Sequence, residues 1–271
     1  MALRSCKRCR KIGRVSEPSE ERGETLALPP EVRRVVVLGD PHGDLIALDL
    51  VLAREAGPET VILSAGDNVG YADATLSSYL CELLAAKGIR SVRGNHEAWS
   101  EEGELSQAPP GRPRQLSEAA WAYCQGLPHR IRLEAPGSGR AIALVHSLPG
   151  WAYVNANQTK RLLDVEEADL VFCGHTHRPA IYALKRGNRR ARVTRLDVRK
   201  DQPVRVELDP ELRYVVDAGS LARPSAPRVG MIPTRGSYAL LDLDARTLEL
   251  RSVDKEPRLR QLLEESLQRP Q

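Results

Sequence analysis

The sequence predicts an α/β (α+β) fold, because strand-like and helix-like segments alternate in its first half and strand-like segments dominate its second half. Between residues 33 and 93, short apolar runs are separated by longer segments with a helical apolar period. Between residues 181 and 253, apolar residues alternate with polar and turn residues, a pattern typical of antiparallel strands. No internal repeat of fixed length stands out, so we expect one domain over residues 32–271.

The apolar period also predicts the individual elements. Strands are expected at residues 35–39, 61–65, 89–93, 131–133, 141–145, 170–173, 193–196, 204–208, 213–216, 238–243 and 247–253. Helices are expected at residues 44–56, with Asp44 as N-cap, and at 74–87, 116–124, 159–166 and 256–268. Residues 100–114 are rich in Gly, Pro, Ser and Glu and predict a mobile loop.

Composition places the chain among soluble proteins. It has 271 residues, of which 41% are hydrophobic and 28% charged, enough for a substantial core. An apolar run of about 18 residues is missing and the first residues are basic, so we expect a cytoplasmic protein with no membrane partner. Three of the five cysteines, Cys81, Cys124 and Cys173, lie in apolar or helical contexts, which favours reduced thiols over disulfides.

Residues 1–31 are polar and lack a helical or strand period, so we interpret them as a flexible tail. Cys6 and Cys9 within it have zinc-ribbon spacing, but no second pair of ligands follows nearby. Two interpretations remain open: a metal knuckle completed by another residue or chain, and a solvated basic tail.

Side chains with metal-binding chemistry follow five of the predicted strands. They are Asp40 and His42, Asp67, Asn95 with His96, His146, and His175 with His177. Five of the six histidines of the chain lie at these strand ends. Any one of them alone could be a hydrogen-bonded structural histidine, but core-filling histidines would not gather in this way. Because ligands converge at the carboxyl ends of strands, the pattern predicts a shared site.

The residue types indicate two metal ions. Imidazole, carboxylate and carboxamide groups together suit Mn, Fe, Zn or Ni. The set is too large for one ion, whereas two ions about 3.5–4 Å apart that share a carboxylate stabilise both oxygens of a displacement at phosphorus. Flanking glycines permit tight turns and leave room for phosphate oxygens. The sequence therefore predicts a phosphoester hydrolase.

These motifs, in this order, resemble the calcineurin-like metallophosphoesterase superfamily. The resemblance covers roughly residues 33–253 and rests on Gly39-Asp40-Pro41-His42-Gly43, Gly66-Asp67-Asn68-Val69-Gly70, Gly94-Asn95-His96-Glu97, His146 and Gly174-His175-Thr176-His177. Gly70-Tyr71, Val92-Arg93 and Gly219-Ser220 are similar to its small prokaryotic phosphodiesterase branch, although Asp217-Ala218 stands where that branch often has Asn-Pro. The resemblance implies a four-layer αββα sandwich of two mixed β-sheets flanked by helices.

The resemblance also implies a role for each residue. Asp40, His42 and His177 would hold one ion, Asn95, His146 and His175 the other, and Asp67 would bridge them. The implied nucleophile is a hydroxide between two divalent transition-metal ions, with manganese favoured. His96 is the implied general acid or phosphate contact. Arg93, Arg178 and Arg223 adjoin the motifs and are the candidate phosphate contacts.

Residues 185–210 form an Arg-rich insertion. It either steers a polyanionic substrate toward the metals or is an edge hairpin whose charges prevent aggregation, and we favour the second interpretation. The net charge is only +4 and the aromatic content only 4%, so nucleic acid is possible as a partner but is not favoured.

We therefore predict a binuclear metal-dependent phosphoester hydrolase, and favour a phosphodiesterase acting on a nucleotide-type substrate. The alternatives are a phosphomonoesterase or protein phosphatase, and a symmetrical dinucleoside tetraphosphate hydrolase. In the superfamily that the sequence resembles, phosphoprotein phosphatases and symmetrical dinucleoside tetraphosphatases carry an Asp-Arg pair in the second motif. This chain lacks that pair. A non-catalytic scaffold on the same fold is disfavoured by the presence of His96 and His146.

Overall fold

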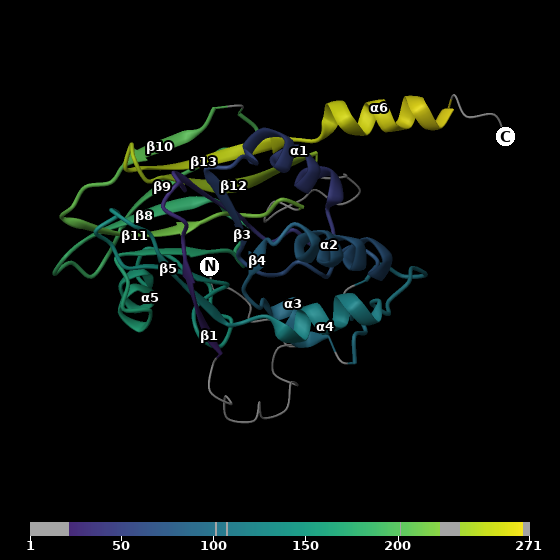
Figure 1. Ribbon diagram of the computed structural model, residues 1–271, viewed down its shortest axis with the longest axis horizontal. Coiled ribbons are helices and arrows are strands. Elements are labelled where there is room, and N and C mark those ends of the chain that lie inside the picture. The colour runs from purple at the N-terminus through teal and green to yellow at the C-terminus, as the bar shows by residue number, and fades with distance from the viewer. Residues whose placement is uncertain (1–21, 101, 107, 201, 223–233, 268–271) are drawn as a thin grey trace, which may run out of the picture.

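Two mixed β-sheets pack face to face and carry helices on their outer faces (Figure 1). The computed structural model describes residues 22–100, 102–106, 108–200, 202–222 and 234–267. The predicted fold class is confirmed. In the part of the chain described, no helix is long and apolar enough to span a membrane.

The larger sheet has seven strands. Their order is β1 (Gly23–Ala27), β5 (Arg130–Glu134), β6 (Ile142–Val145), β7 (Leu170–Cys173), β11 (Leu212–Asp217), β8 (Ala180–Lys185) and β9 (Arg192–Arg195). Strands β6, β7 and β11 are parallel neighbours, so their carboxyl ends meet at one edge of the sheet. That edge is where β6 and β7 deliver His146 and His175.

The smaller sheet has six strands. Their order is β10 (Val204–Glu207), β13 (Thr247–Asp254), β12 (Arg235–Asp242), β2 (Arg34–Leu38), β3 (Thr60–Ser64) and β4 (Arg90–Ser91). Strands β2, β3 and β4 are parallel, and each ends at one of the first three motifs. Both sheets thus bring motif-bearing strand ends toward one region.

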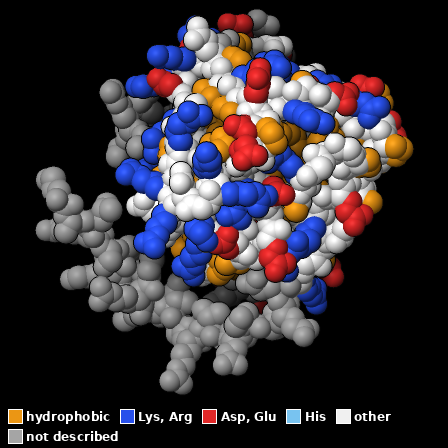
Figure 2. All heavy atoms as spheres, turned by 90° about the vertical axis from the view of Figure 1, so that its left-hand side faces the viewer, with side chains coloured by type: hydrophobic (Ala, Val, Ile, Leu, Met, Phe, Trp, Pro, Cys, Tyr) orange, Lys and Arg blue, Asp and Glu red, His pale blue; other side chains and the backbone are white. Residues whose placement is uncertain are grey.

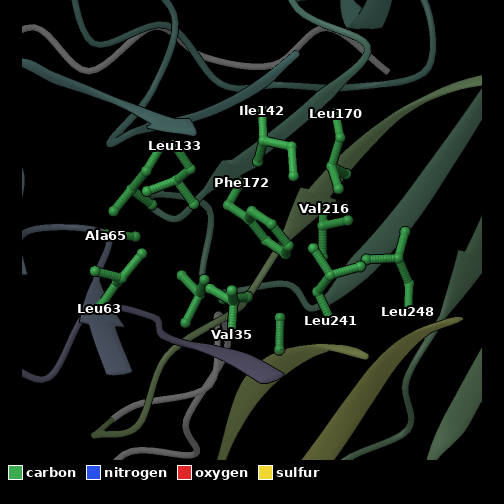
Figure 3. Close-up of a cluster of buried hydrophobic side chains, with 14 of the residues drawn as sticks. Val35, Leu63, Ala65, Leu133, Ile142, Leu170, Phe172, Val216, Leu241 and Leu248 are labelled. Carbon is green, nitrogen blue, oxygen red and sulfur yellow. The ribbon is translucent and has the colours of Figure 1, made fainter. Parts of the chain in front are cut away.

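The main hydrophobic core lies between the two sheets (Figure 3). Strand β2 explains how the layers form, because alternate side chains of a strand point to opposite faces. Val35 and Val37 pack in the core between the sheets, while Val36 and Leu38 pack against helices. All four are fully buried, and burying each such side chain contributes about 1.5–3 kcal/mol.

Helices cover the outer face of each sheet. Helix α1 (Leu45–Glu55) and helix α2 (Ala74–Ala86) pack on the smaller sheet, and α5 (Thr159–Val165) packs on the larger one. The predicted N-cap is confirmed, since Asp44 accepts a hydrogen bond from Ala47 N at 2.9 Å. Helices α3 (Asn95–Trp99) and α4 (Glu118–Gly126) follow β4, and α6 (Glu256–Leu267) extends away from the sandwich (Figure 1).

The structure corrects the predicted tail. Residues 23–27 form strand β1, which pairs in parallel with β5, so the segment belongs to the larger sheet. The strand was missed because it lies at the sheet edge, where its residues alternate between exposed and half-buried. Residues 1–21, with Cys6 and Cys9, lie outside the described residues.

The predicted loop at residues 100–114 folds into turns that contact the body of the domain at several points. Leu105 is buried with Val69 and Ala74, and Glu104 forms a β-bridge with Gln115. The mobility of this loop stays a prediction.

The Arg-rich insertion forms β9, β10 and the turns between them, on the left-hand side of Figure 1. Figure 2 shows that face, on which Lys and Arg side chains lie among Asp and Glu side chains. Arg199 pairs with Asp197 at 2.9 Å, and Arg186 pairs with Asp169 at 2.7 Å. Because β9 and β10 each end a sheet, the arrangement agrees with charged edge strands.

Candidate metal centre

The predicted ligands come together where the two sheets meet. The turns after β2, β3 and β4 bring Asp40, His42, Asp67 and Asn95 from the smaller sheet, and the ends of β6 and β7 bring His146, His175 and His177 from the larger sheet. We call Asp40, His42 and His177 the first half of the cluster, and Asn95, His146 and His175 the second half. Asp67 lies between them.

In the first half, two imidazole nitrogens face each other. His42 Nε2 lies 3.2 Å from His177 Nε2, and His177 Nε2 lies 3.4 Å from Asp40 Oδ2. Hydrogen bonding alone can use at most one proton between the two nitrogens. A cation could bind the lone pairs of the His42 and His177 nitrogens and the Asp40 carboxylate at the same time.

In the second half, four acceptor atoms converge. Asn95 Oδ1 lies 3.0 Å from His146 Nε2, 2.7 Å from His175 Nδ1 and 3.3 Å from Asp67 Oδ2. If the carboxamide were turned, its nitrogen would donate to these atoms. With its oxygen inward, the lone pairs surround a point where a cation would bind.

Backbone carbonyls fix which nitrogen of each ring faces the cluster. His42 Nδ1 lies 2.8 Å from Val69 O, and His146 Nδ1 lies 2.7 Å from Ala65 O. His175 Nε2 lies 2.9 Å from Trp151 O. Since a carbonyl only accepts, each of these nitrogens carries the proton and donates it. When the ring is neutral, its other nitrogen therefore presents a lone pair to the cluster, as in metal-binding histidines.

Asp40 supplies a direct test of whether a cation fits. Its side chain is fully buried, and Oδ2 accepts a hydrogen bond from His175 N at 2.8 Å. The other oxygen, Oδ1, is buried without a hydrogen-bond partner among the residues described here. Its nearest charged neighbour is His146 Nδ1 at 3.6 Å. A buried carboxylate oxygen without a hydrogen bond is costly, and a cation would remove that cost.

The ligand turns are held in an uncommon backbone conformation. Five residues of the cluster have left-handed φ angles: Asp40 (36°), His42 (46°), Asp67 (54°), His175 (70°) and His177 (55°). Residues other than glycine rarely adopt this region, and each instance costs on the order of 1–3 kcal/mol. Such a concentration of strain is characteristic of functional sites.

Burial and the charges of neighbouring side chains shift the pKa values of the cluster residues, some upward and some downward. Burial lowers the pKa of His175 to about 4, helped by the charge of His146. Burial also lowers the pKa of His42 well below its ordinary value, helped by His96. Burial would lower the pKa of His146 too, but the adjacent Asp67 and Asp40 raise it to about 10. Burial raises the pKa of Asp40 well above its ordinary value, whereas the pKa of Asp67 is held low, against the effect of burial, by His146 and His96.

His96 lies beside the shared carboxylate. Its backbone N–H donates to Asp67 Oδ1 at 2.8 Å, and its ring Nε2 lies 3.9 Å from Asp67 Oδ2. The ring packs against Gly70, where a Cβ would lie 2.1 Å from His96 Nδ1, so only glycine fits there. Ligand atoms of His42, Asp67 and His96 lie within 4.8 Å of one another, as do those of Asp67, His146 and His175. The geometry thus allows His96 to act as a ligand or as a proton donor.

Glu97 is a positioning residue to which the sequence motifs alone assign no role. Its carboxylate accepts hydrogen bonds from the backbone N–H groups of Gly94 (2.8 Å), Asp67 (3.1 Å), Asn68 (2.6 Å) and Val69 (3.3 Å). It therefore fixes the second motif to the third. The available signal was its place directly after His96, but a tertiary bond to another motif cannot be inferred from spacing.

The predicted phosphate contacts have different positions. Arg178 is exposed next to His177 and lines a cavity of about 210 Å³ together with Arg195 and Arg235. Arg93 is half-buried and acts electrostatically on Cys124, and its Nε is buried without a partner among the residues described. Arg223 lies outside the described residues. Of the two described arginines, Arg178 is the exposed one, and its role as a phosphate contact stays a prediction.

Comparison with known proteins identifies the family. The model of the calcineurin-like phosphoesterase family matches residues 33–179, more than half of the chain. The chain belongs to this family. A comparison with curated protein sequences gave no match. The phosphoesterase is similar to the crystal structure of a metallophosphoesterase from Sphaerobacter thermophilus, with 27% identity and a TM-score of 0.61 over 82% of this chain and 88% of the other.

Two further solved structures are less similar to this chain. A predicted phosphoesterase from Streptococcus pneumoniae is 18% identical with a TM-score of 0.41, over 83% of this chain and 90% of the other. Vacuolar Protein Sorting 29 from Cryptosporidium parvum is 15% identical with a TM-score of 0.42, over 82% of this chain and 98% of the other. The family match makes the chain a metal-dependent phosphoesterase. Its family uses a binuclear centre, and the cluster holds candidate ligands for one.

Proposed function

We propose that this phosphoesterase is a phosphodiesterase acting on a nucleotide-type substrate at a binuclear metal centre. Asp40, His42 and His177 would hold one ion, Asn95, His146 and His175 the second, and Asp67 both. Two bound divalent ions would supply Lewis acidity and lower the pKa of a bound water toward neutrality. The observation that carries the proposal is the convergence of lone pairs on two points beside one shared carboxylate.

His96 would handle a proton at the edge of the cluster. Burial lowers the pKa of His96 below its ordinary value, against the charge of Asp67 that raises it. A ring that is neutral in the resting site and close to a carboxylate can donate an N–H hydrogen bond to a phosphate oxygen. It can transfer a proton to a leaving oxygen only after it has taken one up, for example from the attacking water. Glu97 and Gly70 hold this ring and the shared carboxylate in place.

The second motif favours a diester over a monoester. An Asp-Arg pair in this motif would add a guanidinium group to the site, and its charge would suit a dianionic monoester. Here Asn68 and Val69 occupy the stretch before Gly70. The Asn68 side chain is buried, accepts from Ser64 Oγ at 2.7 Å and donates to Ser91 Oγ at 2.9 Å. It therefore supports the turn instead of reaching a phosphate. A site with less positive charge suits a diester, which carries a single negative charge.

A phosphoester panel tests the proposal. Metal-stripped protein is supplied separately with Mn²⁺, Fe²⁺, Zn²⁺ and Ni²⁺, and hydrolysis of bis-p-nitrophenyl phosphate is compared with that of p-nitrophenyl phosphate, a phosphopeptide and diadenosine tetraphosphate. We expect the diester to be hydrolysed fastest. Faster hydrolysis of p-nitrophenyl phosphate or the phosphopeptide would indicate a phosphatase, and release of nucleoside diphosphates from the tetraphosphate would indicate a dinucleoside polyphosphate hydrolase.

A further inference from the structure

Aromatic side chains surround the ligand cluster although the chain contains few of them. It has one Phe, seven Tyr and three Trp. Four of these residues, Tyr71, Trp99, Trp151 and Tyr153, lie against histidines of the cluster or against His96. The low aromatic content of the sequence gave no sign that its aromatic residues would gather at one site.

The first aromatic pair lies beside the first half of the cluster. The Tyr71 ring centroid is 4.6 Å from that of His42 and 4.8 Å from that of His96. The Trp99 ring is 5.4 Å from His96. Tyr71 and Trp99 are each 37% exposed, a large fraction for aromatic side chains in contact with a buried cluster. Their outer parts are therefore open to solvent beside the cluster.

The second aromatic pair lies beside the second half. Tyr153 is stacked on His175, with a centroid distance of 4.7 Å and an interplanar angle of 23°, and Trp151 lies 5.8 Å from His146. Tyr153 is 63% exposed, so the ring face turned away from His175 is open to solvent. An exposed, flat and oriented ring is a ready surface for stacking.

Backbone strain shows that the aromatic positions are fixed. Tyr71 has φ 46° and Trp151 has φ 57°, both in the left-handed region that bulky residues avoid. The Trp151 carbonyl accepts the hydrogen bond from His175 Nε2, so the turn that places this indole ring also orients a ligand. Strain of about 1–3 kcal/mol at each residue persists where the surrounding structure holds it in place, which is common at ligand sites.

We propose that these two pairs are base-stacking surfaces, and that the favoured substrate is a dinucleotide-type phosphodiester with a nucleobase on each side of the attacked phosphorus. The inference rests on the proposed phosphodiesterase function. The first pair adjoins His42 and His96 and the second pair adjoins the second half, so a phosphorus held between the halves would have a ring surface on either side. Stacking uses the π-face that every base has, so the site would discriminate little among bases.

The inference is tested by comparing thymidylyl-thymidine, which has two bases, with the methyl phosphodiester of thymidine, which has one. We expect kcat/KM to be about 5- to 100-fold higher for the first, the range expected for stacking of one additional base. Trp99→Ala and Tyr153→Ala should each lower this preference several-fold. Tyr153→Phe, which keeps the ring, should retain it. The matched control is Tyr79→Ala, since Tyr79 is 59% exposed on α2 and should leave the preference unchanged.

Binding to metal-free protein gives a second readout. Trp99 and Trp151 are two of the three tryptophans, so thymidine 5′-monophosphate should quench the intrinsic fluorescence by stacking near them. Tyr153→Ala should weaken the binding that quenching reports, and Tyr79→Ala should not. Absence of saturable quenching in the wild-type protein would contradict the inference.

The outcomes separate this inference from the function on which it rests. If diesters are hydrolysed without a preference for two bases, the inference is wrong and the phosphodiesterase proposal stands. If no diester is hydrolysed with any metal, the function itself is wrong. If the alanine variants lose metal and lose activity equally on both substrates, the rings only support the ligand histidines and the inference is wrong.

Discussion

The two halves of the ligand cluster use similar groups but hold their protons differently. In the second half, His146 is buried between Asp67 and Asp40, which raise its pKa to about 10. In the first half, burial and the neighbouring His96 keep the pKa of His42 well below its ordinary value. A cation entering the second half must therefore displace a proton from an imidazole, whereas in the first half the His42 ring is already neutral. Like ligands at one site can thus respond differently to pH.

Removing the carboxylate that both halves share should have the largest effect. Asp67→Asn takes away the one charged ligand between the two metal positions and the partner that holds His146. We expect turnover of bis-p-nitrophenyl phosphate to fall below detection and the metal content to drop, as measured by plasma mass spectrometry. Retention of two ions and full turnover would show that Asp67 does not bridge them.

Replacing His96 should separate catalysis from metal binding. His96→Asn removes a ring that lies 3.9 Å from the Asp67 carboxylate but leaves the ligands of both halves in place. We expect both metals to remain and turnover to fall roughly 100-fold, the scale of a lost acid–base group. Loss of a metal ion would make His96 a ligand and would change the composition of the first half.

The pH dependence of metal affinity should differ between the halves. His42→Ala removes a ligand of the first half, so metal binding to this variant reports the second half. His146→Ala removes a ligand of the second half, so metal binding to that variant reports the first half. Below pH 10, binding at the second half displaces the His146 proton, so its affinity should rise about 10-fold per pH unit. In the first half burial holds the pKa of His42 well below its ordinary value, so this ring has no proton to lose between pH 7 and 9. Calorimetric titration with Zn²⁺ between pH 7 and 9 measures both slopes, and equal slopes would contradict the comparison.

Asp217 gives the smallest expected effect. It is fully buried and accepts a hydrogen bond at 2.5 Å from Oγ1 of Thr176, the residue between His175 and His177, and burial raises its pKa to about 7. Because the folded state binds this proton more tightly than the unfolded state, stability falls as pH rises from about 4 to 7 and the cost is fully present above 7. Asp217→Asn should therefore raise the Tm of metal-free protein by a few degrees at pH 8.5 and by less at pH 5. The same change in Tm at both pH values would show that Asp217 does not titrate in this range.

Much of the cluster could be predicted because its signals are local. An apolar run such as Val35–Leu38 predicts a buried strand, and a strand end followed by glycine and a metal-binding side chain predicts a ligand. The parallel order of β2, β3 and β4 then brings three such ends together. For the same reason helix α1 and its N-cap Asp44 were predicted correctly.

The features that the sequence did not predict depend on contacts between segments that are distant in the chain. Strand β1 is half-buried at a sheet edge and carries little apolar signal. The role of Glu97 depends on four N–H groups, three of them about 30 residues away. Tyr153 lies in no motif, and only the fold places its ring on His175.

The number of metal ions bound by each half tests the central claim most directly. Metal-stripped protein is loaded with Mn²⁺ or Zn²⁺, freed of excess metal, and its content is measured for the wild type, His42→Ala and His146→Ala. We predict two ions per chain for the wild type and one for each variant, because each substitution removes a ligand from one half only. One ion or none in the wild type, or two ions in both variants, would contradict a binuclear centre built from these two halves.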